Sequence, residues 1–165
     1  MAMNDNMIKR DRLRFTKNKL SANLTLLAIV FNALYFVSIY KNDVGTYYYK
    51  LIIGISVVYN LLFMLTAFLS SEGVKAYKKG YSYVLIALGI GQIIRIFIIP
   101  LQARNATLVV NAVETPAMEN GKFLYVSVCL IASAALCVIA GLVNMTKAHM
   151  LASRQAEIER MQKGS

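Results

Sequence analysis

The chain has 165 residues, 58% of them hydrophobic, and carries a formal net charge of +10 at pH 7. Its mean hydropathy of +0.53 exceeds what an ordinary soluble core requires. A soluble helical bundle would need polar faces at a 3.6-residue period, and apolar runs such as residues 24–30 show none. The composition therefore excludes a soluble bundle and predicts an integral membrane protein.

Four apolar runs bounded by charge each have the roughly 20 residues that cross a ~30 Å hydrocarbon layer as a helix. We expect a basic segment over residues 1–20, a transmembrane domain over 21–145, and a tail over 146–165 with a separate short helix at 148–161. The expected fold is all-α, with four transmembrane helices in an antiparallel up-down bundle. The predicted spans are residues 21–40, 51–71, 82–101 and 123–145.

Turn residues and one long loop mark the connections. We expect Gly73 and Gly80 to turn the chain between the second and third spans. The longest connection is the outer loop over residues 102–122, in which 107–110 is β-prone and 114–121 has the composition of a turn. A loop of this length serves either as a functional lid or as a plain tether.

Lysine and arginine residues are distributed unevenly around the spans. They crowd the segment from Lys9 to Lys19, the short loop from Lys75 to Lys79, and the tail after the fourth span. Short loops rich in Lys and Arg stay in the cytoplasm, so both termini are expected there, with the chain in the plasma (inner) membrane. The same segments would lie against anionic lipid headgroups at the cytoplasmic face of the bilayer. This accounts for the net charge without nucleic acid as a partner.

Polar side chains of all four spans fall at about one depth, near the middle of the bilayer: Asn32, Asn60, Gln92 and Ser133. The estimate uses a rise of ~1.5 Å per residue from the ends of each span. In one interpretation the carboxamides hydrogen-bond between helices and fix the register of the bundle. In the other they line a ligand-binding site. The candidate site residues are Arg95, Gln92, Asn32, Asn60, Tyr35 and Ser56.

Arg95 is the most informative member of this set, because a charge within a span costs ~2.5 to 3.5 kcal/mol on insertion scales. Arginine does not shed its proton to avoid that cost, and no acidic residue lies within any predicted span. One explanation is that the side chain snorkels to the outer headgroups. The others are an anionic ligand, a lipid phosphate, a carboxylate folding in from the outer loop, or an acid of a partner protein.

Small residues recur at every fourth position of the fourth span and form one smooth ridge on a helix. Close approach through such residues is a main source of helix association in lipid. The ridge therefore serves either packing within the bundle or the interface of a homo-oligomer. Its members are Cys129, Ser133, Cys137 and Gly141.

The sequence lacks the residue patterns that usually bind metals, bind nucleotides, carry out disulfide exchange or couple transport to protons. His149 is the only histidine, no C-x-x-C occurs, no carboxylate lies in a span, and no phosphate-binding glycine motif is present. We therefore expect no metal, no cofactor and no enzyme activity; a lipid enzyme is poorly served because Tyr and Arg titrate far from neutral pH. The leading expectation is a small transport-type protein, working as a homo-oligomer, that binds or passes an uncharged or anionic solute. The alternative is a non-catalytic accessory or regulatory subunit of a larger membrane complex.

Overall fold

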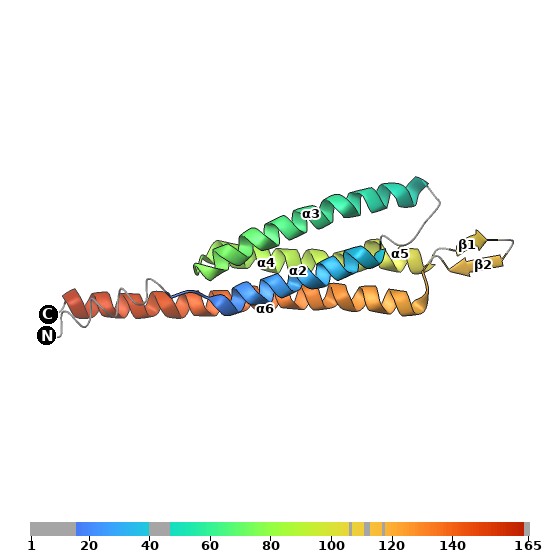
Figure 1. Cartoon of the computed structure of the whole chain (residues 1–165). Coiled ribbons are helices and arrows are strands. Elements are labelled where there is room, and N and C mark those ends of the chain that lie inside the picture. The colour runs from blue at the N-terminus through green and yellow to red at the C-terminus, as the bar shows by residue number, and fades with distance from the viewer. Residues whose placement is uncertain (1–15, 40–46, 106, 111–112, 117, 164–165) are drawn as a thin grey trace.

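The computed structural model describes residues 16–39, 47–105, 107–110, 113–116 and 118–163 (Figure 1). Four helical segments of this part of the chain are long and apolar enough to cross a membrane: Lys19–Ile39, Gly54–Lys75, Lys79–Asn105 and Asn120–Met161. The prediction of a helical membrane protein with four candidate spans is confirmed to that extent. In chain order the elements are α2 (Lys19–Ile39), α3 (Tyr47–Lys75), α4 (Lys79–Ile98), α5 (Pro100–Asn105), β1 (Thr107–Val110), β2 (Val113–Pro116) and α6 (Asn120–Lys163).

Helix α6 is the element along which α2 and α4 pack (Figure 1). Its contacts with α2 run in opposite chain order. The Ser21 hydroxyl donates to the Ala140 carbonyl at 2.6 Å. Further along α2, the Ala28 carbonyl accepts from the Ser133 hydroxyl at 2.9 Å. Helix α3 contacts α2 and α4 and leans away from the other helices toward its Tyr47 end, as Figure 1 shows.

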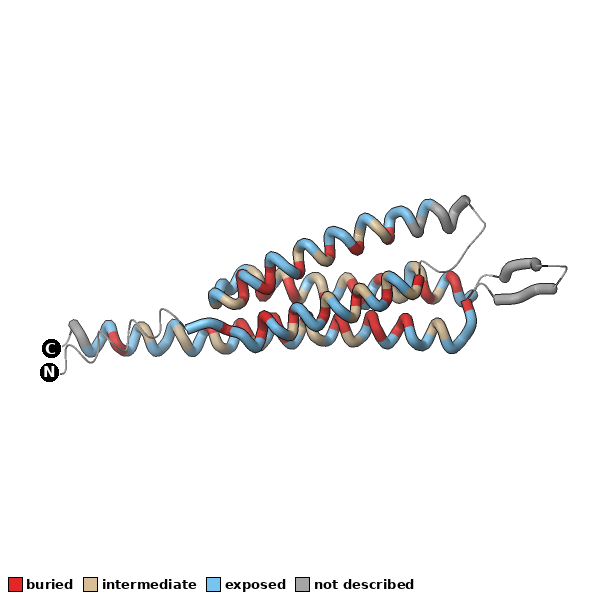
Figure 2. Tube along the Cα trace, viewed as in Figure 1, coloured by how far each residue is buried: buried red, intermediate tan, exposed pale blue. Residues whose placement is uncertain are grey.

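The helices bury their polar faces and expose their apolar ones, the reverse of a soluble bundle. Along α2 the buried positions include Ser21, Thr25, Ala28, Asn32 and Tyr35, spaced four, three, four and three residues apart. Figure 2 shows such buried positions recurring about once per turn along each helix. Hydrocarbon is as apolar as leucine, so burial of apolar surface gives little stability in a bilayer. Hydrogen bonds and close packing must supply most of the association between these helices.

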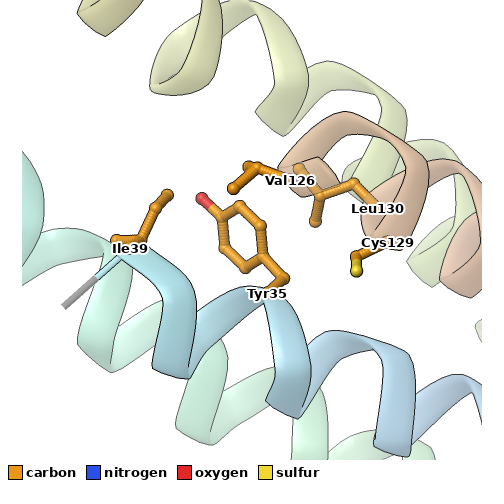
Figure 3. Packing of buried hydrophobic residues seen from close by; sticks show 5 residues of the cluster. All are labelled: Tyr35, Ile39, Val126, Cys129 and Leu130. Atoms are coloured by element: carbon orange, nitrogen blue, oxygen red, sulfur yellow. The ribbon is translucent and has the colours of Figure 1, made fainter. Parts of the chain in front are cut away.

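Apolar contacts between the helices form three clusters along the bundle. One, shown in Figure 3, places the Tyr35 ring of α2 beside Ile39 and against α6 side chains, including Val126 and Leu130. The second joins Ala28 of α2, Phe63 and Ala67 of α3, and Cys137 of α6. The third joins Val74 of α3, Leu85 of α4 and Ala140 of α6.

Two glycines allow α4 and α6 to approach closely. A Cβ at Gly141 of α6 would lie 2.9 Å from the Ser82 carbonyl oxygen. One at Gly89 of α4 would lie 2.9 Å from the Ala134 carbonyl oxygen. A backbone carbonyl cannot move aside as a side chain can, so either added methyl group would push the two helices apart.

The turn between α3 and α4 differs from the prediction, because Gly73 lies inside α3 and Gly80 lies inside α4. The reversal is made at Tyr77, which has a φ of 57°. Its amide donates to the Val74 carbonyl, and the Lys78 amide donates to the Gly73 carbonyl. This is the Schellman arrangement, with tyrosine where glycine is usual. Gly73 serves packing instead, since a Cβ there would collide with the Tyr81 ring.

Other predicted boundaries also change. Pro100 begins α5 as its first residue, where its missing amide hydrogen costs nothing. Residues 114–116 were expected to be turn, but they belong to β2, which pairs with β1 in an antiparallel hairpin. Residues 148–161 are helical as expected, but they form no separate helix, because α6 continues without a break to Lys163. No glycine or proline lies between Gly141 and that residue to end the helix. Of the predicted basic segment over residues 1–20, the structure describes only the part from Thr16.

Candidate functional site

Arg95 of α4 reaches across to α3 and is nearly buried, with 4% of its surface exposed. Its Nη1 donates to Asn60 Oδ1 at 2.7 Å and its Nη2 donates to Ser56 Oγ at 2.6 Å. A weaker contact of 3.5 Å joins Nη2 to the Ser56 carbonyl oxygen. Arg95 therefore ends between the helices and does not snorkel to the outer headgroups, because α3 supplies it with acceptors.

Helix α2 completes the polar contacts through Asn32, which is fully buried. Asn32 Oδ1 accepts a hydrogen bond of 2.9 Å from Gln92 Nε2 and a longer one of 3.3 Å from Arg95 Nη1. Gln92 and Arg95 lie three residues apart on α4, so both side chains project from the same face of that helix. One carboxamide oxygen thus connects two positions of α4 to α2.

Two tyrosine rings lie against the guanidinium group. Arg95 Cζ is 4.3 Å from the ring centroid of Tyr35 on α2 and 5.0 Å from that of Tyr59 on α3. Contacts of this kind contribute about 2 kcal/mol or more when the pair is removed from water. We call the set of Arg95, Gln92, Asn32, Asn60, Ser56, Tyr35 and Tyr59 the Arg95 cluster.

Several buried polar atoms of the Arg95 cluster have no hydrogen-bond partner in the described part of the chain. A buried polar group without a partner costs about 1 to 3 kcal/mol in proteins. Each such group in a folded protein calls for an explanation, such as strain, an ordered water, an ion or a ligand. The atoms are Asn32 Nδ2, Asn60 Nδ2, Arg95 Nε, Gln92 Oε1 and the Tyr35 hydroxyl oxygen.

The charge in the Arg95 cluster is also not balanced by the cluster itself. Every described hydrogen-bond partner of Arg95 is a neutral carboxamide, hydroxyl or carbonyl group. The tyrosine rings offer only the partial negative charge of their faces. The arrangement can therefore hold a polar or negatively charged group by hydrogen bonds and by the guanidinium charge.

The structure brings the six candidate site residues together, as the depth estimate predicted. Tyr59, which sequence reasoning left out of the site, also belongs to the cluster. Its signal was available, because it adjoins Asn60 and lies three residues after Ser56, within one turn of the same helix. The function of these residues stays a prediction, since geometry alone does not test it.

The small-residue ridge of α6 is buried against helices of the same chain. Cys129 packs in the apolar cluster that contains Tyr35, Val126 and Leu130. Cys137 packs in the apolar cluster that contains Ala28, Phe63 and Ala67. Ser133 donates to α2, and Gly141 faces α4. The ridge is therefore used within the chain. Association of several copies stays a prediction, and it would use another surface.

A second polar network, which sequence reasoning missed, lies at the end of the bundle where α2 begins. Asn18 Nδ2 donates to Asn144 Oδ1 at 3.0 Å, and Asn144 Nδ2 donates to Ser82 Oγ at 2.8 Å. The Asn18 amide also donates to the Lys75 carbonyl, and Lys147 Nζ donates to Asn18 Oδ1. This Asn18 network joins all four long helices. The network gives hydrogen-bond partners to two buried asparagines, Asn18 and Asn144.

No metal or cofactor site is evident in the residues that the structure describes. Among them, no three His, Cys, Asp or Glu side chains come together in a way that could hold a metal ion. Cys129 and Cys137 are both buried and unpaired. The Arg95 cluster offers mainly nitrogen donors and one cation, which suit an electron-rich ligand rather than a cation.

Comparison with known proteins found no family model, no curated protein and no solved structure that matches the chain.

Proposed function

We propose that the chain is a small transport-type membrane protein, channel-like or transporter-like, that binds or passes an uncharged or anionic polar solute at the Arg95 cluster. The observation that carries this proposal is the buried Arg95 guanidinium, whose described partners are all neutral. Ionisable groups inside a membrane are costly and usually mark substrate or ion pathways. Spare polar atoms on α2, α3 and α4 support the proposal, because they give a solute hydrogen bonds in place of its water shell.

We further propose an antiparallel up-down arrangement in the plasma (inner) membrane, with both termini in the cytoplasm. The Asn18 network supports this orientation, because Lys75 and Lys147 both bond to Asn18 at one end of the bundle. Lys78 lies there too, since its carbonyl accepts from Asn144. A concentration of lysine at one end is the pattern expected of a cytoplasmic face. At that face, the same lysines would contact anionic lipid headgroups.

Transport can be tested with purified protein reconstituted into liposomes. Stopped-flow light scattering would follow volume changes after exposure to gradients of urea, glycerol and potassium nitrate, the last with valinomycin so that potassium can follow the anion. We expect faster entry of at least one solute than in protein-free liposomes, and loss of that effect in Arg95→Gln. Arg104→Gln is the matched control, because Arg104 is exposed and lies on the Phe123 ring away from the cluster. Rates equal to those of protein-free liposomes for every solute would contradict the proposal.

A second candidate function is that of an accessory or regulatory subunit of a larger membrane complex. One observation favours it: α6 continues 16 residues past Lys147, about 24 Å at the usual helical rise. The exposed charges Arg154, Glu157 and Arg160 lie on this extension. The test is affinity purification of tagged chain from its native membrane. A stoichiometric partner that is lost in Glu157→Lys would support this candidate, whereas recovery of the chain alone would count against it.

A further inference from the structure

The Arg95 cluster has more hydrogen-bond donors than acceptors. Arg95 has only donors, so the oxygen atoms of Asn32 and Asn60 both face it. Their amide nitrogens are left without partners, as are Arg95 Nε and the Tyr35 hydroxyl. The one obligate acceptor left over is Gln92 Oε1. The described cluster therefore lacks hydrogen-bond acceptors for its unpaired donors.

The spare donors lie close to one another. Oδ1 and Nδ2 of an asparagine share one carbon atom, and the Oδ1 atoms of Asn32 and Asn60 both contact Arg95 Nη1. Both amide groups are thus beside the same guanidinium nitrogen. The Tyr35 ring, which carries the spare hydroxyl, lies 4.3 Å from Arg95 Cζ. A single small ligand at this position could accept hydrogen bonds from α2, α3 and α4 together.

The charge of the cluster distinguishes between an uncharged and an anionic ligand. A neutral solute can satisfy the donors but leaves the guanidinium charge uncompensated in a medium of low dielectric. An anion satisfies both at once, and charge-assisted hydrogen bonds are about twice as strong as neutral ones. An oxyanion has several acceptor atoms pointing in different directions, which fits donors that come from three helices.

We propose that the Arg95 cluster binds a small oxyanion, of the carboxylate or nitrate class, and discriminates against neutral molecules of the same shape. This inference rests on the proposed function, because it names the class of solute that the same site takes. The shared chemistry is that of a negatively charged oxygen group, which a free anion or a lipid phosphate can supply.

The test is a binding measurement on the full chain in nanodiscs of zwitterionic lipid. Isothermal titration calorimetry would compare acetate with acetamide, which have the same shape and differ in charge. We expect acetamide to bind at least tenfold more weakly than acetate. Equal binding of the two probes, or binding of neither acetate nor nitrate, would overturn the proposal.

Asn60→Asp supplies the cluster with its own carboxylate, 2.7 Å from Arg95 in the position of the present amide oxygen. This isosteric change should weaken acetate binding at least tenfold while thermal unfolding shows the protein folded. Tyr35→Phe provides a second test that removes only one hydroxyl group and keeps the ring against Arg95, and it should weaken acetate binding about fivefold. Unchanged acetate affinity in both variants would overturn the proposal.

Ser70→Ala is the matched control. Its hydroxyl is another buried polar group without a described partner, on the same helix as Asn60 but ten residues away, about 15 Å along α3. Acetate affinity should match that of the unmodified chain. A loss as large as that in Tyr35→Phe would show a general packing effect and would overturn the assignment to the Arg95 cluster.

Two further measurements distinguish a free anion from a lipid phosphate, and failure of the anion-site proposal from failure of the transport proposal. If acetate binds more tightly to the protein in phospholipid-free detergent than in nanodiscs, a lipid phosphate occupies the site in the bilayer; equal affinity in both would indicate a free anion. Acetate binding without flux in liposomes would leave the anion site standing and remove the transport proposal. Flux of an uncharged solute without acetate binding would remove the anion-site proposal and leave the transport proposal standing.

Discussion

Arg95 Nη1 and Asn60 Oδ1 meet at 2.7 Å between α4 and α3, and both residues are almost completely buried. This contact and the one with Ser56 join α3 to α4 well away from the turn at Tyr77 that connects the two helices. Toward the Tyr47 end, α3 leans away from the other helices (Figure 1). The guanidinium group therefore has two tasks, because it holds α3 in place and carries the charge of the candidate site.

The first prediction concerns the strength of this contact. In a double-mutant cycle with Arg95→Met and Asn60→Leu, we expect a coupling free energy of about 1.5 to 3 kcal/mol, as for hydrogen bonds to charged groups. The free energy of unfolding would be measured in bicelles by titration with a denaturing detergent. Additive effects of the two substitutions would show that the contact does not hold α3.

The Asn18 network should contribute to stability even though it lies far from the Arg95 cluster. Asn144→Leu removes the bonds to Asn18, Ser82 and the Lys78 carbonyl, and it leaves the buried Asn18 and Ser82 side chains without those partners. We expect a loss of about 1 to 3 kcal/mol in the free energy of unfolding. Asn23→Leu, at an exposed position of α2, is the control and should change stability by less than about 0.5 kcal/mol. Similar losses for both variants would contradict a specific role for the network.

Close packing of α4 on α6 makes a separate prediction. Gly141→Ala places a methyl group 2.9 Å from the Ser82 carbonyl oxygen and should destabilise the fold by about 1 to 3 kcal/mol. Gly54→Ala on α3 meets nothing within 4 Å and should be neutral or slightly stabilising. The same denaturing-detergent titration checks both variants. A neutral Gly141→Ala would mean that the two helices are not in such close contact.

The proposed orientation predicts which side of the membrane each exposed position reaches. In a background with Cys129→Ala and Cys137→Ala, Ser153→Cys should be protected from a membrane-impermeant maleimide applied to intact cells. Glu119→Cys should react, because this exposed residue precedes α6 at the opposite end from the Asn18 network. The reverse labelling pattern would place both termini outside.

The sequence predicts the four candidate spans well, because a helix that crosses a bilayer needs a long apolar run and hydropathy detects such runs directly. It predicts helix ends poorly, since a helix does not stop where its residues become polar. Helix α6 continues to Lys163 through charged residues that favour helix as much as apolar ones do. The predicted position of the turn is wrong for another reason: glycine is common in turns, but here Gly73 lies in α3 against the Tyr81 ring and the chain reverses at Tyr77.

Six of the seven residues of the Arg95 cluster could be predicted from the sequence, all but Tyr59, but their hydrogen bonds could not. Depth along a span follows from residue counting, which brings Asn32, Asn60 and Gln92 to one level and places Arg95 roughly 5 Å further along its helix. Counting gives no rotation of one helix about another, so it left open whether Arg95 pointed inward or toward the headgroups. The pair of Asn18 and Asn144, which are 126 residues apart, was out of reach because nothing local to either residue indicates its partner.

The central claim, that the Arg95 cluster holds a ligand, is tested most directly by native mass spectrometry of the protein released from lipid nanodiscs. The unmodified chain and Asn60→Asp would be purified identically, without added ligand. We predict a small bound mass on the unmodified chain that is absent from Asn60→Asp, and that mass would characterise the ligand. The bare chain mass in both samples, or a complex with an unrelated host protein, would contradict the claim and favour the accessory-subunit alternative.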